Sequence, residues 1–485
     1  MSEQSSAVKE GELIGQLMQH TNLGVEDEGY AATRAGVELL LTELIENNRI
    51  DERADKRFVD QMIHELDRRL SQQMDEILHH PTFQELESTW KSLEYLLQGT
   101  DFRENIKVQV ISTSKTDLFE DFEDAPDFTK SGLYRHLYTE EFGQFGGLPV
   151  GAVITDYSVS HGSQDVKLMQ HLATLGGMIH APIILNADAS FFGVTSYSSL
   201  PQLKELGSIF DSPNYAKWNG FRDSDLSRNI GLTMPKMMIR QPYGEDNPAK
   251  SFNYEETTGT TLNNYLWGNA SFAFGANVND SFAQYRWCPN IIGPTSGGGV
   301  NDMDINVVEQ DGQELVIGPV ETTISDRREY ELAEMGFIPL VLKKGSNQAA
   351  FFSANSTQRP QFFGNDEEGR QAELNFRLGT QLPYMFIVNR LAHYIKVLQR
   401  ENLGSWKSRG ELEGELNKWL RQYVADQENP SPATRAQRPL RKAELTVSTV
   451  PGEVGWYSVQ LEVTPHFKYM GASFTLNLTS TLDAA

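Results

Sequence analysis

The chain has 485 residues, of which 42 are basic and 66 acidic, and its formal net charge is −24. This length exceeds the size at which single hydrophobic cores stop growing, so we expect two or three domains. The negative charge argues against binding to nucleic acid or to an anionic membrane, and the single cysteine, Cys288, excludes intrachain disulfides and cysteine-rich metal sites.

The chain starts with a polar stretch instead of a basic segment followed by an apolar leader. No apolar run approaches the roughly 18 residues of a membrane-spanning helix. We therefore expect a cytoplasmic protein with no direct membrane insertion.

The first hundred residues are predicted to be helical. A short amphipathic helix at 12–19 carries one apolar stripe, formed by Leu13, Ile14, Leu17 and Met18. It is shorter than the ~12 to 15 residues that an isolated helix needs, so it is either a detached recognition peptide or a helix docked on its own domain. Further helices are expected from residue 35, over about 53–79, and from residue 81 or 82.

An α/β pattern begins near residue 107. The expected order is a strand at 107–112, a strand from Val150, a helix over about 164–178 and a strand from Ala181. The short crossover predicts a parallel pair of strands. A hairpin is expected over 309–318, a second helical block over about 381–425, and a Pro-containing linker over 429–439.

The chain ends in three predicted strands. The first runs from Glu444, the second places Tyr457, Val459, Leu461 and Val463 on one face, and the third alternates Phe474, Leu476 and Leu478 with polar residues. Residues 477–481 contain neither proline nor charge, the features that usually protect a sheet edge. The strands therefore need a partner surface, either in their own domain or in a neighbouring subunit through strand addition.

Two candidate motifs for catalysis or ligand binding each lack a required residue. His64 and Glu65 begin a zinc-protease-like pattern, but Arg68 stands where the second histidine ligand is needed. The glycine-rich segment 293–299 lacks the lysine of a phosphate-binding loop and favours a flexible loop. We expect no enzyme activity, no catalytic residues, no metal and no cofactor. The competing hypothesis is an intracellular α/β enzyme that uses His161, Asp165 or His171.

Six stretches resemble one known family. They are HPTFQELESTWKSLEYLL from His80, FRDSDLSRNIGLTMPKMMIRQPYG from Phe221, NNYLWGNASFAF from Asn263, LPYMFIVNRLAHYIKVLQRENLGSW from Leu382, LNKWLRQYV from Leu416 and GWYSVQLEVTPHFKYMGASFTLNL from Gly455. In this order they resemble the large subunit of the type VI secretion contractile sheath, the VipB/TssC family. A phage tail or related contractile particle is the alternative, and a separately encoded small partner distinguishes the two.

The resemblance implies a structural protein of the bacterial cytoplasm. Its expected partners are a small sheath subunit of the VipA/TssB type, further copies of itself in a helical polymer, the Hcp inner tube, the baseplate and the AAA+ unfoldase ClpV. Contraction would propel the tube into a target cell. The stripe of Leu13, Ile14, Leu17 and Met18 would be recognised by the unfoldase, and the strands carrying Val459, Leu461, Val463, Phe474, Leu476 and Leu478 would pair between subunits.

The expected fold is mixed α/β, with inner domains similar to those of contractile phage tail sheaths. The predicted division follows in chain order. It comprises an unfoldase-recognition helix and linker (1–33), a helical region that packs with the small subunit (34–105), an α/β sheath body of one or two subdomains (106–380), a helical block (381–428), a linker (429–443) and a β ribbon for the inter-subunit sheet (444–485).

Overall fold

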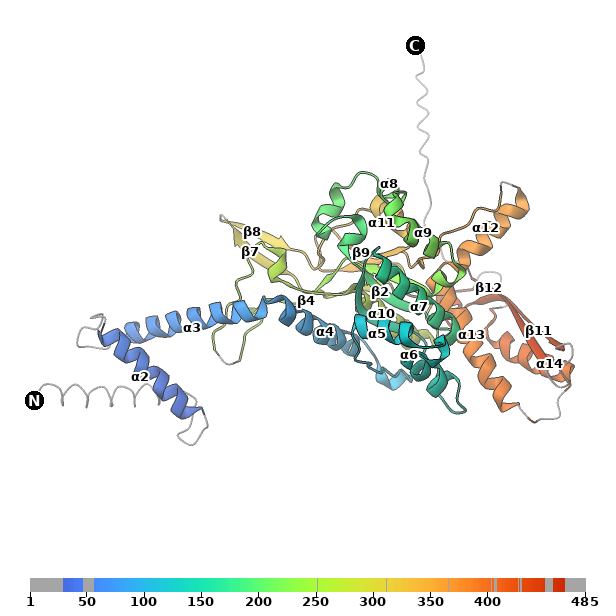
Figure 1. Ribbon diagram of the computed structural model, residues 1–485, viewed down its shortest axis with the longest axis horizontal. Helices are drawn as coiled ribbons and strands as arrows, with labels where there is room; N and C mark the ends of the chain where they lie inside the picture. Colours follow the sequence, from blue (N-terminus) through green and yellow to red (C-terminus); the bar gives the residue numbers. More distant parts are fainter. Residues whose placement is uncertain are drawn as a thin grey trace, which may run out of the picture. The chain divides into compact units, whose positions relative to one another are not determined.

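The computed structural model describes residues 29–46, 56–250, 252–310, 312–364, 366–402, 404, 408–425, 427, 430–449 and 457–466 (Figure 1). The chain divides into two compact units. The smaller comprises Met1–Asp75 and Tyr243–Glu256, and the larger comprises Glu76–Pro242 and Thr257–Ala485. Within the described residues, no helix combines the length and apolarity needed to cross a membrane.

The described α-helices are α2 (Tyr30–Glu46), α3 (Lys56–Leu78), α4 (Pro81–Gln98), α5 (Lys115–Asp124), α6 (Gly132–Tyr134), α7 (Ser163–Ile179), α8 (Leu206–Phe210), α9 (Ala216–Arg222), α10 (Ala270–Tyr285), α11 (Asp326–Glu334), α12 (Glu367–Gly379), α13 (Leu382–Glu401), α14 (Arg409–Leu420) and α15 (Pro432–Gln437). The helices predicted from residues 35, 53 and 81 are confirmed as α2, α3 and α4. Proline occupies the first turn of α4, where its missing N–H costs nothing.

The strands are β1 (Val153–Val159), β2 (Ile183–Ala187), β3 (Ile230–Met234), β4 (Met237–Arg240), β5 (Leu266–Gly268), β6 (Gly299–Val300), β7 (Asn306–Gln310), β8 (Gln313–Ile317), β9 (Phe337–Leu342), β10 (Ala349–Phe351), β11 (Leu440–Thr449) and β12 (Tyr457–Pro465). Short turns of 3₁₀ helix are η1 (Phe102–Glu104), η2 (Phe128–Lys130), η4 (Ala189–Phe192), η5 (Tyr197–Gln202), η6 (Pro213–Tyr215), η7 (Asp225–Asn229), η8 (Leu262–Asn264) and η9 (Arg421–Tyr423), and η3 (Arg135–Phe142) is a π-helix. The expected mixed α/β class is confirmed.

A six-stranded sheet in the order β1-β2-β3-β9-β10-β6 forms the centre of the larger unit. The first four strands are parallel, whereas β10 is antiparallel to both of its neighbours. The predicted strand–helix–strand unit is therefore confirmed as β1, α7 and β2. The predicted hairpin is confirmed as β7 and β8, which are antiparallel and form a separate two-stranded sheet.

The two faces of this sheet are covered by different core clusters. In β2, Ile183 and Leu185 belong to the cluster that includes α7 residues, whereas Ile184 belongs to the cluster that includes α10 residues. In β9, Phe337 and Ile338 alternate in the same way. Because both faces of the sheet are covered, the inner strands β2, β3 and β9 are short and largely apolar runs without regular polar alternation.

Three local expectations were wrong. The predicted strand at 107–112 is an extended segment without strand pairing. The predicted linker contains α15, and β11 begins at Leu440, before the predicted start at Glu444. The glycine-rich segment is a packed turn rather than a flexible loop. Gly293 N–H donates to the Phe351 carbonyl at 2.7 Å, and a Cβ at Gly298 would lie 2.6 Å from backbone atoms of Ile292.

Candidate functional site

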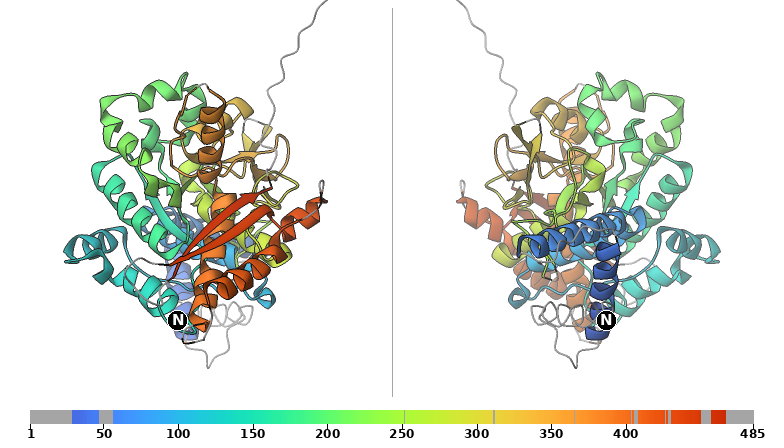
Figure 2. Two further views of the ribbon diagram at one scale, coloured as in Figure 1. Left: turned by 90° about the vertical axis from the view of Figure 1, so that its right-hand side faces the viewer. Right: turned by 90° about the vertical axis from the view of Figure 1, so that its left-hand side faces the viewer.

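The C-terminal hairpin is the element that the sequence marked as an assembly site. β11 and β12 pair antiparallel, with Leu445 opposite Leu461 and Val447 opposite Val459. Residues that lie directly opposite in such a pair share one face of the ribbon. This face packs on α13 and α14, which lie beneath the hairpin in the left-hand view of Figure 2.

The apolar face of the hairpin is therefore covered within its own domain. Leu445 and Val447 are each 1% exposed, and Val459, Leu461 and Val463 are partly buried against the same cluster. That cluster also contains Leu391 of α13, and Leu416 and Leu420 of α14. Each fully buried aliphatic side chain contributes roughly 1.5 to 3 kcal/mol to folding. The hairpin is a part of the domain core, and its side chains alone do not require a neighbouring subunit.

On the side away from β12, side chains of α14 bind the β11 backbone at Leu445 and Val447. Asn417 of α14 accepts a hydrogen bond from Leu445 N–H at 3.0 Å and donates one to the Leu445 carbonyl at 2.7 Å. Glu413 of the same helix accepts a bond from Val447 N–H at 3.2 Å. Helix side chains thus replace a neighbouring strand along this edge.

The opposite edge of the hairpin is open among the described residues. Leu445 and Val447 direct their backbone groups away from β12, so their partners Leu461 and Val459 form non-hydrogen-bonded pairs. The backbone N–H and C=O of Val459 and Leu461 must then point away from β11. In the described part of the chain, no strand pairs with this side of β12.

The remaining predicted site residues fall outside the described residues. These are Leu13, Ile14, Leu17 and Met18 of the predicted recognition helix and Phe474, Leu476 and Leu478 of the predicted third strand. Asn417 and Glu413 were missed, because their sequence positions carry no signal that a strand edge lies beside their helix.

Helix α4 presents an exposed apolar stripe. Phe83, Leu86, Trp90 and Leu97 are 37%, 57%, 63% and 37% exposed. At about 100° per residue, these four positions fall within about 60° of one another around the helix axis. Leu96, about 110° from the centre of this stripe, packs against Phe272 and Ala276 of α10. The helix therefore buries one apolar face and leaves a second one uncovered.

The buried side of α4 is fixed by polar contacts as well. Glu87 forms an ion pair of 2.7 Å with Arg240 of β4, and the two side chains are 13% and 7% exposed. Ser88 donates a hydrogen bond to the Trp267 carbonyl of β5 at 2.7 Å. These contacts fix the rotation of the helix, so the exposed stripe has a defined direction.

The residues of the alternative enzyme hypothesis have separate structural partners. Asp165 accepts a hydrogen bond from Ser160 N–H at 2.7 Å and pairs with Lys115 at 2.6 Å. His171 contacts Glu123 at 2.9 Å. His161 stacks on the Tyr215 ring at 4.5 Å. No hydrogen bond joins any two of these three residues in the described structure, so they do not form a nucleophile and base pair. Nor do the described residues include a cluster of three potential metal ligands.

A buried histidine ties the C-terminal helices to the central α/β layer. His393 of α13 is 6% exposed, and its Nε2 contacts the Ile179 carbonyl at the end of α7 at 2.8 Å. Because the carbonyl only accepts, Nε2 carries the proton. The pKa of His393 is lowered to about 4, chiefly by burial, while the bond to the Ile179 carbonyl acts in the opposite direction and the nearby His180, Arg390 and Lys396 add to the lowering.

This histidine predicts an acid-labile fold. Its folded-state pKa lies below its ordinary value of 6.5, so the unfolded chain binds a proton first as the pH falls. Stability is lost between pH 6.5 and about 4, by about 3 kcal/mol in total. We expect His393→Gln, whose amide can still donate to Ile179, to lose less stability over this range. Urea unfolding of both proteins at pH 7 and pH 4.5 measures the difference; equal losses would contradict the assignment.

Two family models match the chain. The VipB model, described as the EvpB/VC_A0108 tail sheath N-terminal domain, matches residues 60–358. The second model, described as the EvpB/VC_A0108 tail sheath gpW/gp25-like domain, matches residues 371–482. The second match covers α13, α14 and the hairpin.

A curated relative and two solved structures are also similar. The chain is 37% identical over 450 residues to the type VI secretion system sheath protein TssC1 of Pseudomonas aeruginosa strain PAO1, which covers 92% of this chain and 88% of the relative. A chain of the anti-feeding prophage baseplate matches with 8% identity and a TM-score of 0.39, covering 77% of this chain and 83% of its own length. A chain of the contracted anti-feeding prophage sheath matches with 12% identity and a TM-score of 0.33, covering 77% and 91%.

Proposed function

Because the chain belongs to the VipB family of type VI secretion tail sheath proteins, we propose that it is the large subunit of a contractile sheath. The family is structural and not enzymatic. The subunit pairs with a small sheath subunit, and these heterodimers polymerise in the bacterial cytoplasm around an Hcp tube that stands on a baseplate. Contraction of the polymer drives the tube into a target cell.

The proposal that strand pairing links neighbouring subunits rests on the open edge of β12. One edge of the hairpin is occupied by Asn417 and Glu413, whereas Val459 and Leu461 direct their backbone groups outward. Among the described residues of the hairpin, this edge of β12 is the one that an incoming strand can join. The predicted third strand with Phe474, Leu476 and Leu478 is the proposed segment that crosses between neighbouring copies.

The α4 stripe supports a second contact, with the small sheath subunit. Four large apolar side chains on one side of a helix are expected to bind a partner helix. Trp90 is the largest of them, and tryptophan is enriched among the residues that dominate binding energy at interfaces. We assign this stripe to the contact within the heterodimer and the β12 edge to the contacts between heterodimers.

This division of roles suits contraction. Subunits must change their relative orientation without dissociating, and a strand shared between two chains is held by several backbone hydrogen bonds at once. Surface ion pairs exchange more easily, since each contributes only about 0 to 1 kcal/mol. The strand linkage would therefore persist while other surfaces change partners.

Co-expression with the small sheath subunit tests the proposal. We expect a co-purifying heterodimer and tubular polymers in negative-stain electron microscopy. A chain that stays monomeric beside a folded small subunit would contradict the heterodimer. A single chain that forms tubes without any small subunit would favour a sheath of the phage tail type.

The predicted recognition helix yields a separate prediction. In the predicted helix over 12–19, Leu13, Ile14, Leu17 and Met18 would form one apolar stripe, and a charge in its centre would oppose its burial in a binding groove. We expect Leu17→Asp to abolish binding of the unfoldase ClpV while polymers still form. Fluorescence anisotropy with a labelled peptide of residues 1–30 measures the affinity, and Gln16→Asp serves as the control on the polar side. Unchanged affinity of the Leu17→Asp peptide would contradict the assignment.

A further inference from the structure

One extended segment in the larger unit has backbone groups that form no hydrogen bonds within the described residues. Ile106–Ser112 joins η1 to α5, and among the described residues none of its backbone groups forms a hydrogen bond with another part of the chain. Val110 and Ile111 are 64% and 43% exposed. The sequence predicted a strand here, and the residues have strand propensity, but this chain supplies no neighbouring strand.

The start of this segment is held in place. Asp101 accepts a hydrogen bond from Arg103 N–H at 3.0 Å and so caps η1. Asn105 then adopts the left-handed conformation, with φ of 58°, and turns the chain out of the helix. Arg286, at the C-terminal cap of α10, donates to the Glu104 carbonyl at 2.8 Å and pairs with the Glu104 carboxylate.

The end of the segment is held equally well. The Tyr157 hydroxyl of β1 donates to the Thr113 carbonyl at 2.7 Å. Ser114 and Asp117 form a reciprocal capping box at the start of α5. The seven residues between these anchors would span about 23 Å if fully extended, which is the length of an ordinary strand. The segment is therefore a pre-ordered edge that can accept a strand without first paying the entropy of its own ordering.

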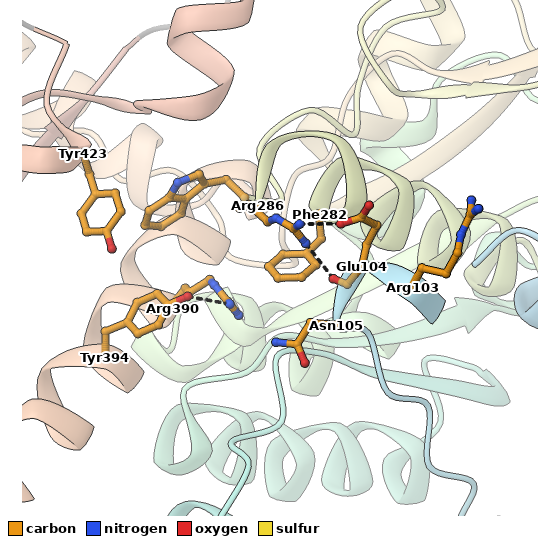
Figure 3. A pocket seen from close by; sticks show the side chains of 9 residues that line it. Arg103, Glu104, Asn105, Phe282, Arg286, Arg390, Tyr394 and Tyr423 are labelled. Atoms are coloured by element: carbon orange, nitrogen blue, oxygen red, sulfur yellow. Dashed lines mark hydrogen bonds and ion pairs between the residues drawn. The ribbon is translucent and has the colours of Figure 1, made fainter. Parts of the chain in front are cut away.

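A polar cavity of about 420 Å³ lies at the start of the segment. Its lining includes Glu104 and Asn105, which directly precede the segment, Phe282 of α10, Arg286 at the C-terminal cap of α10, and Arg390 of α13. Figure 3 shows Arg390 beside Phe282 and Tyr394, with the Arg286–Glu104 contact on the neighbouring wall. A side chain from a strand laid along 106–112 could enter this cavity.

Arg390 is the cation in this cavity that lacks a carboxylate. Arg103 pairs with Asp101, and Arg286 pairs with Glu104. The Arg390 guanidinium stacks on the rings of Phe282 and Tyr394, at 4.5 and 4.9 Å, and donates to the Tyr394 hydroxyl at 2.7 Å. Its Nε is buried without a hydrogen-bond partner, and no carboxylate of the described residues pairs with it. A carboxylate can accept two parallel bonds from a guanidinium in this geometry.

We propose that Ile106–Ser112 accepts an extended strand from the small sheath subunit, and that an acidic side chain of this strand enters the cavity and pairs with Arg390. Because the free groups of this segment are a row of backbone donors and acceptors, they fit a polypeptide strand better than a small molecule. Because the guanidinium has no carboxylate partner, it fits an aspartate or glutamate side chain. The source of the strand rests on the proposed function. It follows from position, since the segment begins eight residues after α4, whose stripe is assigned to the same partner.

Hydrogen exchange on the wild-type chain tests the strand pairing directly. We expect the amides of 106–112 to exchange rapidly in the free chain and at least about tenfold more slowly in the heterodimer. Protection that first appears in the polymer would assign the strand to another copy of the large subunit and would overturn the proposal. Unchanged exchange in both assemblies would also overturn it. A failure to obtain any heterodimer would instead contradict the proposed function.

Variants test the two contacts separately. Val110→Pro removes a backbone donor and clashes with an incoming strand, whereas Val110→Thr keeps the backbone intact. Arg390→Met keeps the apolar stem that stacks on Phe282 but removes the charge. We expect Val110→Pro and Arg390→Met each to weaken heterodimer binding about tenfold or more, and Val110→Thr to leave it within about twofold. Equal affinities for Val110→Pro and Val110→Thr, or wild-type affinity for Arg390→Met, would contradict the respective contact.

Discussion

Replacing Val459 with proline is expected to abolish sheath polymers while the subunit stays folded. The N–H of Val459 points away from β11, because its partner Val447 uses its own N–H to reach Glu413. Proline at this position therefore removes no hydrogen bond from the hairpin, and edge strands tolerate it. It removes one donor from the open edge and places its ring where an incoming strand would lie.

The control for this variant is Val459→Ala. Both substitutions remove part of a half-buried side chain, at a cost of about 1 kcal/mol, but alanine keeps the outward N–H. We expect tubes from wild type and from Val459→Ala, and only dispersed heterodimers from Val459→Pro, in electron micrographs of material co-expressed with the small subunit. Normal tubes from Val459→Pro, with circular dichroism showing a folded protein, would mean that this edge is not used for assembly.

Placing two charges on the α4 stripe is expected to prevent heterodimer formation. Leu86 and Trp90 are 57% and 63% exposed and lie one helical turn apart. Leu86→Glu with Trp90→Glu should leave the free chain as stable as wild type, because neither side chain belongs to a core. At an apolar interface, however, two carboxylates would be desolvated without partners. Central tryptophans at interfaces are often worth 2 kcal/mol or more, so we expect at least about a thirtyfold loss of affinity.

Two controls separate the effect of the stripe from that of charge. Trp90→Leu keeps an apolar residue on the stripe and should retain most of the binding. Gln98→Glu adds a negative charge to the same helix outside the stripe and should leave binding within about threefold. Isothermal titration with the purified small subunit measures all four proteins. Wild-type affinity of the double variant would place the small subunit elsewhere.

The elements with strong local patterns were predictable from sequence. α7, β1 and β2 have clear periodicity and short connections, and so do α4 and the two described strands of the hairpin. β3 and β9 were not predicted as strands, although both lie in the middle of the sheet. Their neighbours come from distant parts of the chain, and their buried runs, such as Phe337–Leu342, have no alternation to identify them.

The assembly surfaces were predictable only in part. The apolar stripe of α4 can be read from sequence, but not which of its two apolar faces is covered by α10. The alternation of Val459, Leu461 and Val463 predicted a strand, yet the role of its side chains in the domain core depends on α13 and α14. The segment 106–112 is the opposite case: its strand propensity is evident, and the missing partner strand appears only in the folded chain.

The central claim is that the subunit polymerises through strands exchanged at the β12 edge. A cryo-electron microscopy reconstruction of the co-expressed assembly tests it most directly. The account predicts a tubular polymer in which backbone hydrogen bonds join Val459 and Leu461 to a strand of a neighbouring subunit. A polymer in which that edge is covered only by the chain's own residues would contradict it.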